Sequence, residues 1–402
     1  MHKLLKRTLR SKDMTHSLSN GCVKVVQLSL APIDNDARVH RAARALTQAG
    51  YDCLIIAPGK ATTTVMMPLS RKLHMALAYG VSGWLGCKAS ETAFWSFRAH
   101  HKVLEKVLAV NPQIVHAHDW NALPVAMRAA DILGCKIVYD AHEFTADMHG
   151  ERLLWSQTMP RAINNLEAAG IKRADAMICV SASQAKLLAE HFPAHPKITV
   201  IRNIPEADPI PFRAINPEKV VLHYHGALAK GRGIEIILEA LSLLDERYTL
   251  RMVGDWQSIA VERHIMSMIT KFGLTKRIDI LSAVAIDEVV LQAAMADIGL
   301  CILPEKTSHN EIALPNKVFE YACAGLAIIM SGGIEFRQLI TKRPCGWALD
   351  FKNGKDLAEL LASLTPDSIN RARWQATMVA REVTWGSERN QLLEVFSRLS
   401  IN

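Results

Sequence analysis

Residues 313–325 read Ala-Leu-Pro-Asn-Lys-Val-Phe-Glu-Tyr-Ala-Cys-Ala-Gly and lie between two apolar runs, Ile298–Pro304 and Ala327–Met330. Short apolar runs on either side of a helix-length segment predict two buried parallel strands joined by a loop and a helix. Pro315 suits the first helical turn, because its missing N–H would be unpaired there anyway. We therefore expect a strand–helix–strand unit of a doubly wound α/β sheet.

The polar residues of this segment indicate a nucleotide site. Asn316 and Lys317 begin the expected helix, and Glu320 follows about one turn later. In a doubly wound sheet, ligands bind where helix N-termini face the carboxyl ends of strands. A lysine at such a place can bind phosphate, and a glutamate one turn on can accept hydrogen bonds from ribose hydroxyls. An ordinary ion pair on the helix surface is the alternative.

The same alternation of strands and helices extends in both directions along the chain. The expected strands are Val25–Ala31, Cys53–Ala57, Ile114–Asp119, Lys136–Tyr139, Ala176–Ser181, Ile198–Arg202, Val220–Gly226, Leu250–Val253 and Ile278–Leu281, besides the two runs above. Prolines crowd the chain between Pro205 and Pro217, which is typical of a linker. Alternation on both sides of one linker predicts two parallel-sheet domains that face a cleft.

The expected domain boundaries follow from this pattern. They are a basic tail at 1–20, an N-terminal domain at 21–204, a linker at 205–218, a C-terminal domain at 219–380 and a C-terminal helix at 381–402. We expect the last helix to pack back on the N-terminal domain.

Length and composition narrow the class of protein. A chain of 402 residues with 50% hydrophobic residues is expected to fold as two globular domains. Its eight cysteines are dispersed without a CxxC pair, which favours reduced thiols of a cytoplasmic protein over a disulfide framework or a zinc site. Met1–Lys12 lacks the apolar core of a signal peptide. No run of about 20 apolar residues predicts a membrane span.

The net charge of +8 indicates an acidic partner. Nucleic acid is not expected, because the sequence shows no reading motif and no basic stripe with aromatic platforms. Two places combine basic and apolar residues: Met1–Lys12, and Met75–Cys87 with Tyr79 and Trp84 inside it and Arg71, Lys72, Lys88 and Arg98 around it. This combination fits a helix that lies on an anionic membrane. A disordered tail and an ordinary buried helix are the alternatives.

Several motifs follow one another in a characteristic order. They are Asp36-Ala-Arg-Val-His, His116-Ala-His-Asp, Tyr139-Asp-Ala-His-Glu, Ala174-Asp-Ala-Met-Ile-Cys-Val-Ser, Val200-Ile-Arg-Asn-Ile-Pro, His225-Gly-Ala-Leu with Arg232-Gly, and Leu314–Gly325. In this order they resemble the family 4 retaining glycosyltransferases of the GT-B fold, in which two Rossmann-like domains face a central cleft. The resemblance implies transfer of a sugar from a nucleotide-sugar to a lipid-linked saccharide or a glycan in cell-surface glycan biosynthesis, without a metal or other cofactor.

The resemblance also implies a set of site residues. The expected catalytic residues are His118, which would reach the transferring sugar, and Arg232 and Lys317, which would stabilise the leaving diphosphate. The expected donor-binding residues are Gly226, Asn316, Glu320 and Asn203. The expected acceptor-side residues are Asp36, Arg38, His142 and Glu143. For His142 and Glu143, pairing with each other and capping a helix is the alternative.

Two positions depart from the family pattern. Ile312 stands where most relatives have the first of two glutamates, and Ala227 stands where they have an arginine. Relatives with Leu-Pro-Asn-Lys also lack that glutamate, so we expect loop backbone groups and Asn316 to contact the donor sugar. Arg232 can grip a diphosphate bidentately, and Lys317 supplies the second charge. The departures leave two alternatives open, an inactive partner or scaffold protein and a sugar-nucleotide epimerase of the same fold.

Asp34 and Asp36 spell DxD, which holds a metal in another glycosyltransferase fold. Their position before the first expected helix is wrong for that role. We expect one of them to cap the helix and predict no metal site.

Overall fold

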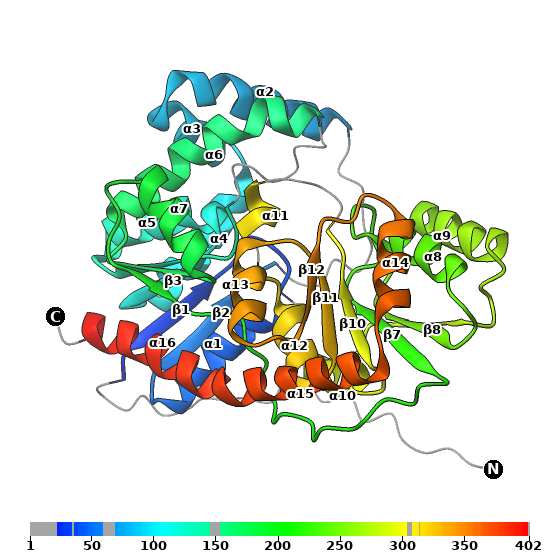
Figure 1. Cartoon of the computed structure of the whole chain (residues 1–402). Coiled ribbons are helices and arrows are strands. Elements are labelled where there is room, and N and C mark those ends of the chain that lie inside the picture. Colours follow the sequence, from blue (N-terminus) through cyan, green and yellow to red (C-terminus); the bar gives the residue numbers. More distant parts are fainter. Residues whose placement is uncertain are drawn as a thin grey trace, which may run out of the picture.

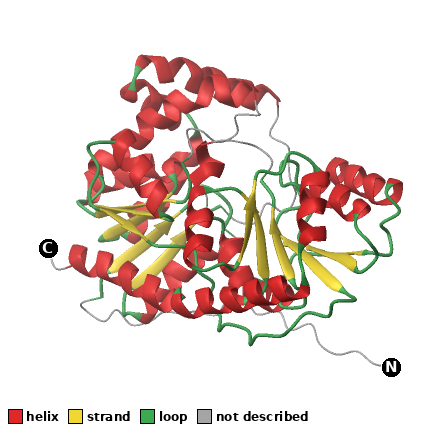
Figure 2. Ribbon diagram, viewed as in Figure 1, coloured by secondary structure: helices red, strands yellow, loops and turns green. Residues whose placement is uncertain are grey.

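The computed structural model describes residues 22–33, 36–58, 69–144, 153–303, 308–312 and 314–400. They form two six-stranded parallel sheets flanked by helices (Figures 1 and 2). The first sheet has the order β2-β1-β3-β4-β5-β6, with β1 Lys24–Leu28, β2 Asp52–Ile56, β3 Ile114–His118, β4 Lys136–Ala141, β5 Ala176–Cys179 and β6 Ile198–Val200. The second has the order β12-β11-β10-β7-β8-β9, with β7 Val220–His225, β8 Tyr248–Val253, β9 Ile278–Leu281, β10 Ile298–Cys301, β11 Ala327–Ser331 and β12 Gly346–Leu349. The predicted pair of doubly wound sheets is confirmed.

Helices connect the strands of both sheets. Those of the first half are α1 Ala37–Gln48, α2 Leu69–Leu85, α3 Cys87–Trp95, α4 Arg98–Val110, α5 Leu123–Leu133, α6 Leu153–Arg173 and α7 Ala182–His191. Those of the second half are α8 Ile234–Leu243, α9 Ile259–Lys271, α10 Val289–Ala293, α11 Ser308–Ile312, α12 Asn316–Cys323, α13 Ile334–Lys342, α14 Gly354–Ser363, α15 Pro366–Glu382 and α16 Trp385–Ser400.

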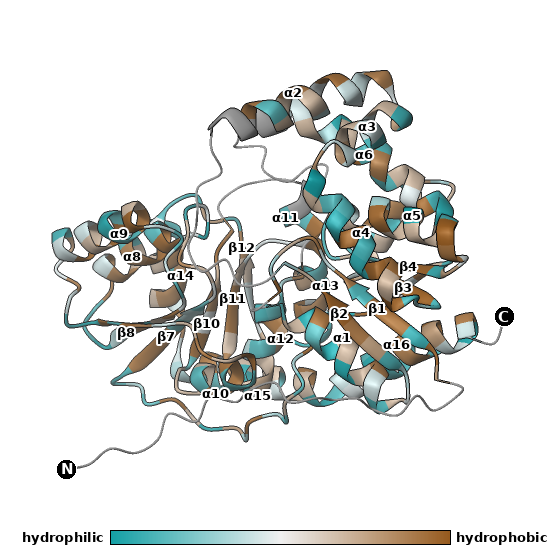
Figure 3. Cartoon of the chain, turned by 180° about the vertical axis from the view of Figure 1, so that it is seen from behind, coloured by the Kyte–Doolittle hydropathy of each residue, from teal (hydrophilic) through white to brown (hydrophobic). Residues whose placement is uncertain are grey.

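Each sheet is buried on both faces, as parallel sheets usually are. In β1, Val26 and Leu28 belong to one apolar core, whereas Val25 belongs to a second core on the opposite face. In β11, Ile329 and Ile328 divide in the same way between the two cores of the second sheet. Figure 3 shows the strands as predominantly hydrophobic. The short apolar runs in the sequence reflect this burial on both faces.

The last helix lies against the first sheet, not the second. Val395 and Phe396 of α16 are buried in one cluster with Val25 and Ile114. Glu388 of α16 is fully buried and accepts hydrogen bonds from the backbone N–H of Arg202 at 2.7 Å and from its Nε at 2.9 Å. The chain therefore crosses between the two halves twice, once after β6 and once before α16.

Some features differ from the sequence-based expectation. Strand β12, a four-residue strand with partly exposed side chains at the edge of the second sheet, was not among the predicted strands. All eight cysteines are unpaired and five of them are buried, in agreement with the expected absence of disulfides. The basic tail at 1–20 and Asp34 lie outside the described residues.

Helices α2, α3 and α6 form a projection from the first half of the molecule, with α2 outermost (Figure 1). Glycines permit the close packing of α2 on α6: a Cβ on Gly83 would lie 2.9 Å from the backbone N of Ala162. The guanidinium of Arg161 lies 3.4 Å from the ring centre of Trp84. None of the helices in the described part of the chain has the length and apolarity needed to cross a membrane.

Candidate functional site

Two cavities of about 540 and 500 Å³ lie between the two halves of the molecule and share part of their walls. The shared wall residues are Ala37, Glu143, Pro315 and Asn316, and they come from both halves. Every residue predicted for the site except His118 lines one of these cavities. The sequence-based residues are therefore brought together at the carboxyl ends of the two sheets.

Glycines at the strand ends shape the floor of the 500 Å³ cavity. Gly226 follows β7 with φ +114°, a conformation that L side chains rarely adopt. A Cβ on Gly226 would lie 3.3 Å from the Nζ of Lys317, and a Cβ on Gly254 would lie 1.9 Å from the Gly226 carbonyl oxygen. Because these two residues are glycines, Lys317 and the loop after β8 can pack closely against the end of β7.

Two cations, Lys317 and Arg232, line the adjoining cavities. Lys317 lies in the first turn of α12, after Pro315 at the N-cap, and its Nζ lies 4.7 Å from the ring centre of Tyr224. Burial and the nearby charge of Arg232 lower the pKa of Lys317. Within the described residues, neither cation has a carboxylate within 4.0 Å. An anion placed between them would relieve their repulsion.

Glu320 lies one turn further along α12, on the wall of the same cavity. Its Oε2 accepts a hydrogen bond from His225 Nε2 at 2.7 Å. Burial alone would raise the pKa of the Glu320 carboxyl, but the hydrogen bond from His225 and the nearby charge of Arg41 lower it overall. Glu320 therefore presents an ionised carboxylate to the cavity.

The wall of the first half is organised around the buried carboxylate of Asp140 on β4. Arg38 of α1 donates to it from Nε at 2.8 Å and from Nη2 at 2.7 Å, and donates from Nη1 to the Ile201 carbonyl at 2.7 Å. Burial raises the pKa of Asp140, but Arg38 outweighs it and holds the pKa well below the usual range. Asp36 caps α1 by accepting from the N–H groups of Arg38 and Val39, as expected for one aspartate of the DxD pair.

Three imidazoles surround the same carboxylate. His116 Nε2, His118 Nδ1 and His142 Nε2 each lie 3.6 Å from Asp140 Oδ2. His118 is only 1% exposed, with Nε2 2.7 Å from Gln27 Oε1 and Nδ1 3.0 Å from His142 Nε2. His118 therefore does not line the cavity, contrary to the expectation for the end of its strand. His142, which directly follows the neighbouring strand β4, lines the 540 Å³ cavity instead.

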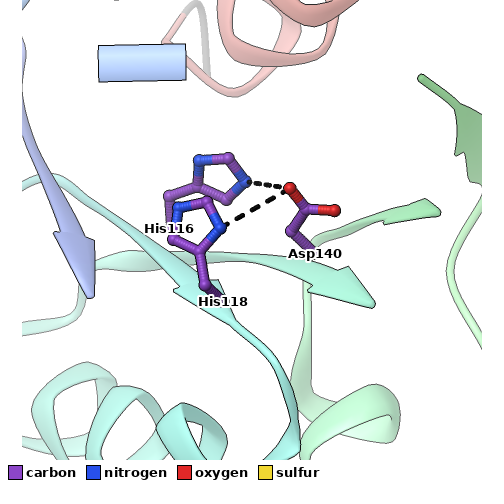
Figure 4. Close-up of side chains that lie close together, drawn as sticks. All are labelled: His116, His118 and Asp140. Carbon is purple, nitrogen blue, oxygen red and sulfur yellow. Dashed lines mark ion pairs between the residues drawn. The ribbon is translucent and has the colours of Figure 1, made fainter. Parts of the chain in front are cut away.

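His116, His118 and Asp140 offer ligand atoms within 4.8 Å of one another, and this donor set is one that a divalent metal can use (Figure 4). Arg38, however, already donates to both oxygens of Asp140, and both ring nitrogens of His118 have hydrogen-bond partners. A metal would have to displace these contacts. We interpret Asp140 and His118 as parts of a buried hydrogen-bond network beneath the cavity, whereas neither ring nitrogen of His116 has a hydrogen-bond partner in the described part of the chain.

The charge of His142 provides a pH-dependent test of this network. Burial alone would lower its pKa, but Asp119 and Asp140 raise it to about 9, above the value of about 6.5 for an exposed histidine. The charged ring thus stabilises the fold fully below pH 6.5, and this contribution is lost as pH rises through 9. We expect the unfolding free energy of the wild type, relative to His142→Gln, to fall by on the order of 2–3 kcal/mol from pH 6 to 10. Urea denaturation of both proteins across this pH range measures the difference in their unfolding free energies. A difference that does not change with pH would mean that His142 is neutral throughout.

Several residues of the site escaped the sequence analysis. Val253, Gly254 and Asp255 at the end of β8 and Ala283, Val284 and Ile286 after β9 also line the 500 Å³ cavity. Apart from Asp255 they carry no polar side chain, and only their position at strand ends could have indicated a role. Ile312, at the position of the absent glutamate, packs against the core of the first half, and its carbonyl oxygen lies 3.5 Å from Ser181 Oγ.

A hydrogen bond beside the cavities also joins the two halves of the molecule. Glu335 in the first turn of α13 accepts a hydrogen bond at 2.5 Å from the backbone N–H of Ser183 in the first turn of α7. A carboxylate at a helix N-terminus is favourable because it faces unpaired N–H groups. This contact stabilises the arrangement in which the two cavities adjoin.

Comparison with known proteins agrees with this architecture. Residues 37–204 match the model of Glycosyltransferase Family 4, and residues 219–367 match that of Glycosyl transferases group 1. Glycogen synthase of Mycobacterium tuberculosis is 30% identical over 172 residues, which cover 40% of this chain and 41% of that protein. The chain thus matches about two-fifths of the length of that relative.

Solved structures resemble the chain over nearly its full length. Sucrose-phosphate synthase from Thermosynechococcus elongatus has a TM-score of 0.69 at 14% identity and covers 94% of this chain and 99% of its own. HepE of Anabaena, solved in complex with UDP and glucose, has a TM-score of 0.67 at 17% identity and covers 94% and 100%. At these identities the structures establish the fold. The two matched models show that the chain belongs to glycosyltransferase family 4, and the solved structures show that it has the two-domain GT-B fold.

Proposed function

We propose that the protein is a retaining glycosyltransferase that moves a sugar from a nucleotide-sugar to a lipid-linked saccharide or polysaccharide acceptor in cell-surface glycan biosynthesis. The observation that carries the proposal is the set formed by Arg232, Lys317 and the ionised Glu320 around two adjoining cavities. Anabaena HepE, of the same fold, has been solved with UDP-glucose, which supports a nucleotide-sugar donor. Retention of anomeric configuration is proposed from the family resemblance.

The chemistry of the cavity walls suggests how the donor would bind. The ribose hydroxyls would donate to Glu320, and the base would enter the end of the cavity formed by the apolar Ala283, Val284 and Ile286 and by Val253–Asp255. The diphosphate would lie between Lys317 and Arg232, near the N-terminus of α12. The sugar would then reach the shared wall at Asn316, where the two cavities meet.

The proposed mechanism depends on charge that develops at the leaving group. As the bond between the anomeric carbon and the phosphate oxygen breaks, the electron pair stays on the diphosphate. Fixed cations stabilise this transition state more than the ground state. Arg232 and Lys317 supply that charge, and the proton of the acceptor hydroxyl leaves to a phosphate oxygen as the new glycosidic bond forms.

The 540 Å³ cavity is proposed as the acceptor site. Its wall carries the predicted acceptor-side residues Asp36, His142 and Glu143, together with Asn203, which the sequence analysis assigned to donor binding. Carboxylates, an imidazolium and an amide can hydrogen-bond the many hydroxyls of a saccharide. The wall thus suits a polar acceptor.

We also propose that the protein acts at the inner face of a membrane. Leu73, Leu77, Val81 and Trp84 form one exposed stripe along α2, with Leu85 beside it, and Trp84 is 69% exposed. Arg161 lies against Trp84, and Lys88 follows in α3. An apolar stripe with basic neighbours suits the interface of an anionic bilayer.

Replacing Leu77 and Trp84 together by glutamate should therefore reduce binding to vesicles. Burial of these two side chains contributes about 3–5 kcal/mol in apolar surroundings, so we expect a loss of at least 10-fold in partitioning onto vesicles of phosphatidylglycerol and phosphatidylethanolamine. Co-sedimentation measures this, and Ile132→Glu, another exposed apolar residue, serves as the matched control. Equal sedimentation of all three proteins would contradict the membrane role of α2.

A donor screen tests the central proposal. The protein is incubated with radiolabelled UDP-, GDP- and dTDP-hexoses and a lipid-linked saccharide extract, and the products are separated by chromatography. Label in the lipid or glycan fraction is the expected result, and NMR of the product would show the retained anomer. Conversion of the donor to an epimer would identify an epimerase, and binding without turnover would identify a partner protein.

Transfer should not require a divalent metal, because cationic side chains are proposed to neutralise the diphosphate. We expect the rate to stay within about 2-fold in excess EDTA, with no gain from added Mn²⁺ or Mg²⁺. Initial rates with and without chelator measure this. Activity that disappears with EDTA and returns with Mn²⁺ would mean that the roles of Arg232 and Lys317 are misassigned.

A further inference from the structure

Two histidines on β7 form a chain of contacts that ends at Glu320. His223 and His225 lie two residues apart, so their side chains share one face of the strand. His223 Nε2 lies 3.2 Å from His225 Nδ1, and His225 Nε2 lies 2.7 Å from Glu320 Oε2. We propose that His225, itself oriented by His223, is a positioning residue that holds Glu320 in place for the ribose of the donor nucleotide. This inference rests on the proposed donor site.

The direction of the hydrogen bonds follows from which atoms are left without partners. An ionised carboxylate only accepts, so His225 must donate to Glu320 from Nε2. His223 Nδ1 is buried and has no hydrogen-bond partner in the described part of the chain. A proton there would leave a buried N–H unsatisfied, which costs about 1–3 kcal/mol. The proton of His223 therefore lies on Nε2 and is donated to His225 Nδ1, and the chain runs from His223 through His225 to Glu320.

Packing restricts both rings to these positions. The ring of Tyr321 contacts His225 edge-on with centroids 4.9 Å apart and His223 with centroids 5.9 Å apart. The Tyr321 hydroxyl donates to the Leu300 carbonyl at 3.0 Å. Gly299 pairs with His223 across the strands, and a Cβ there would lie 2.4 Å from the Tyr321 ring. The absence of a side chain at Gly299 thus lets Tyr321 lie against the two imidazoles.

Several neighbours compete for the carboxylate of Glu320. Lys317 and Arg41 also attract its charge, from α12 itself and from α1 of the other half. The bond from His225 occupies Oε2 and leaves the other oxygen for a ribose hydroxyl. Without that bond, the carboxylate is free to turn toward one of the cations. The loss should then fall on contacts to the ribose and not on contacts to the diphosphate.

Calorimetric titration of His225 variants with two ligands separates these contacts. The probes are UDP and 2′,3′-dideoxy-UDP, with GDP and its dideoxy analogue as a second pair. We expect His225→Phe to weaken ribonucleotide binding about 10-fold and dideoxynucleotide binding less than 2-fold, as for a lost hydrogen bond to a charged group. His225→Gln, whose amide reaches the Nε2 position, should keep most of the affinity, and His225→Asn, one carbon shorter, should not. His264→Phe, at an exposed histidine of α9, is the matched control.

A double-mutant cycle completes the test. In a Glu320→Gln background, His225→Phe should cause less than a 2-fold further loss, because the group that it positions has changed. Equal losses for ribo- and dideoxynucleotides, or full additivity with Glu320→Gln, would overturn the positioning role while leaving the proposed function intact. Failure of the wild type to bind either nucleotide would overturn the donor site and this inference with it. If His225→Phe does not fold, the contrast between His225→Gln and His225→Asn decides the matter.

Discussion

Replacing Arg232 by alanine is expected to reduce kcat about 100- to 1,000-fold at saturating donor, as typically follows the loss of one group that stabilises developing charge. Ala227 carries no charge, so the proposed diphosphate site depends on Arg232 and Lys317, which line the two adjoining cavities. Their attraction grows as charge develops on the leaving oxygen. The effect should therefore appear in kcat and not only in KM.

Two further variants make this result specific. Arg232→Lys should recover part of the rate, because an ammonium restores the charge but not the bidentate geometry. Arg263→Ala, at an exposed position of α9, should leave the rate unchanged. Steady-state kinetics with the donor found in the screen measure all three proteins. A near-normal kcat in a correctly folded Arg232→Ala protein would place the diphosphate elsewhere.

Replacing Asp140 by asparagine is expected to destabilise the protein by about 3–5 kcal/mol, the usual result of leaving a buried charge unpaired. Arg38 is buried and places its guanidinium between Asp140 and the Ile201 carbonyl. Asparagine has nearly the same size as aspartate but cannot neutralise Arg38. Urea denaturation at pH 7 measures the change in unfolding free energy.

An exposed ion pair provides the comparison for this variant. Arg44 and Glu206 lie 3.2 Å apart with both side chains more than a third exposed. Glu206→Gln should therefore cost less than about 1 kcal/mol. A similar small cost for Asp140→Asn would show that water reaches the cluster and screens Arg38.

The sequence predicted best those site residues whose geometry is local. Lys317 and Glu320 lie on one helix, so their spacing in the sequence determines how their side chains are placed relative to each other. Gly226 directly follows the end of its strand. The two sheets and their common edge also followed from the short apolar runs. These features depend on periodicity, which neighbouring residues determine.

Residues whose position depends on strand register were harder to predict. His118 and His142 both follow apolar runs and look alike in the sequence. In the sheet, His118 pairs with Asp140, so His142 extends two residues further toward the cavity. No local pattern encodes that offset. The link from His225 to Glu320, which joins residues 95 positions apart, was missed for the same reason.

The double crossing of the chain restricts how the enzyme can open. The bond between Arg202 and Glu388 brings the end of the first sheet domain beside the start of α16, so the outgoing and returning connections run close together. Two neighbouring connections are expected to act as a hinge that permits rotation about the line between them more readily than sliding or twisting. Cutting the chain before α16 would remove half of that hinge. It would also expose the apolar face of the first sheet that Phe396 covers, so the first half is not a free-standing module.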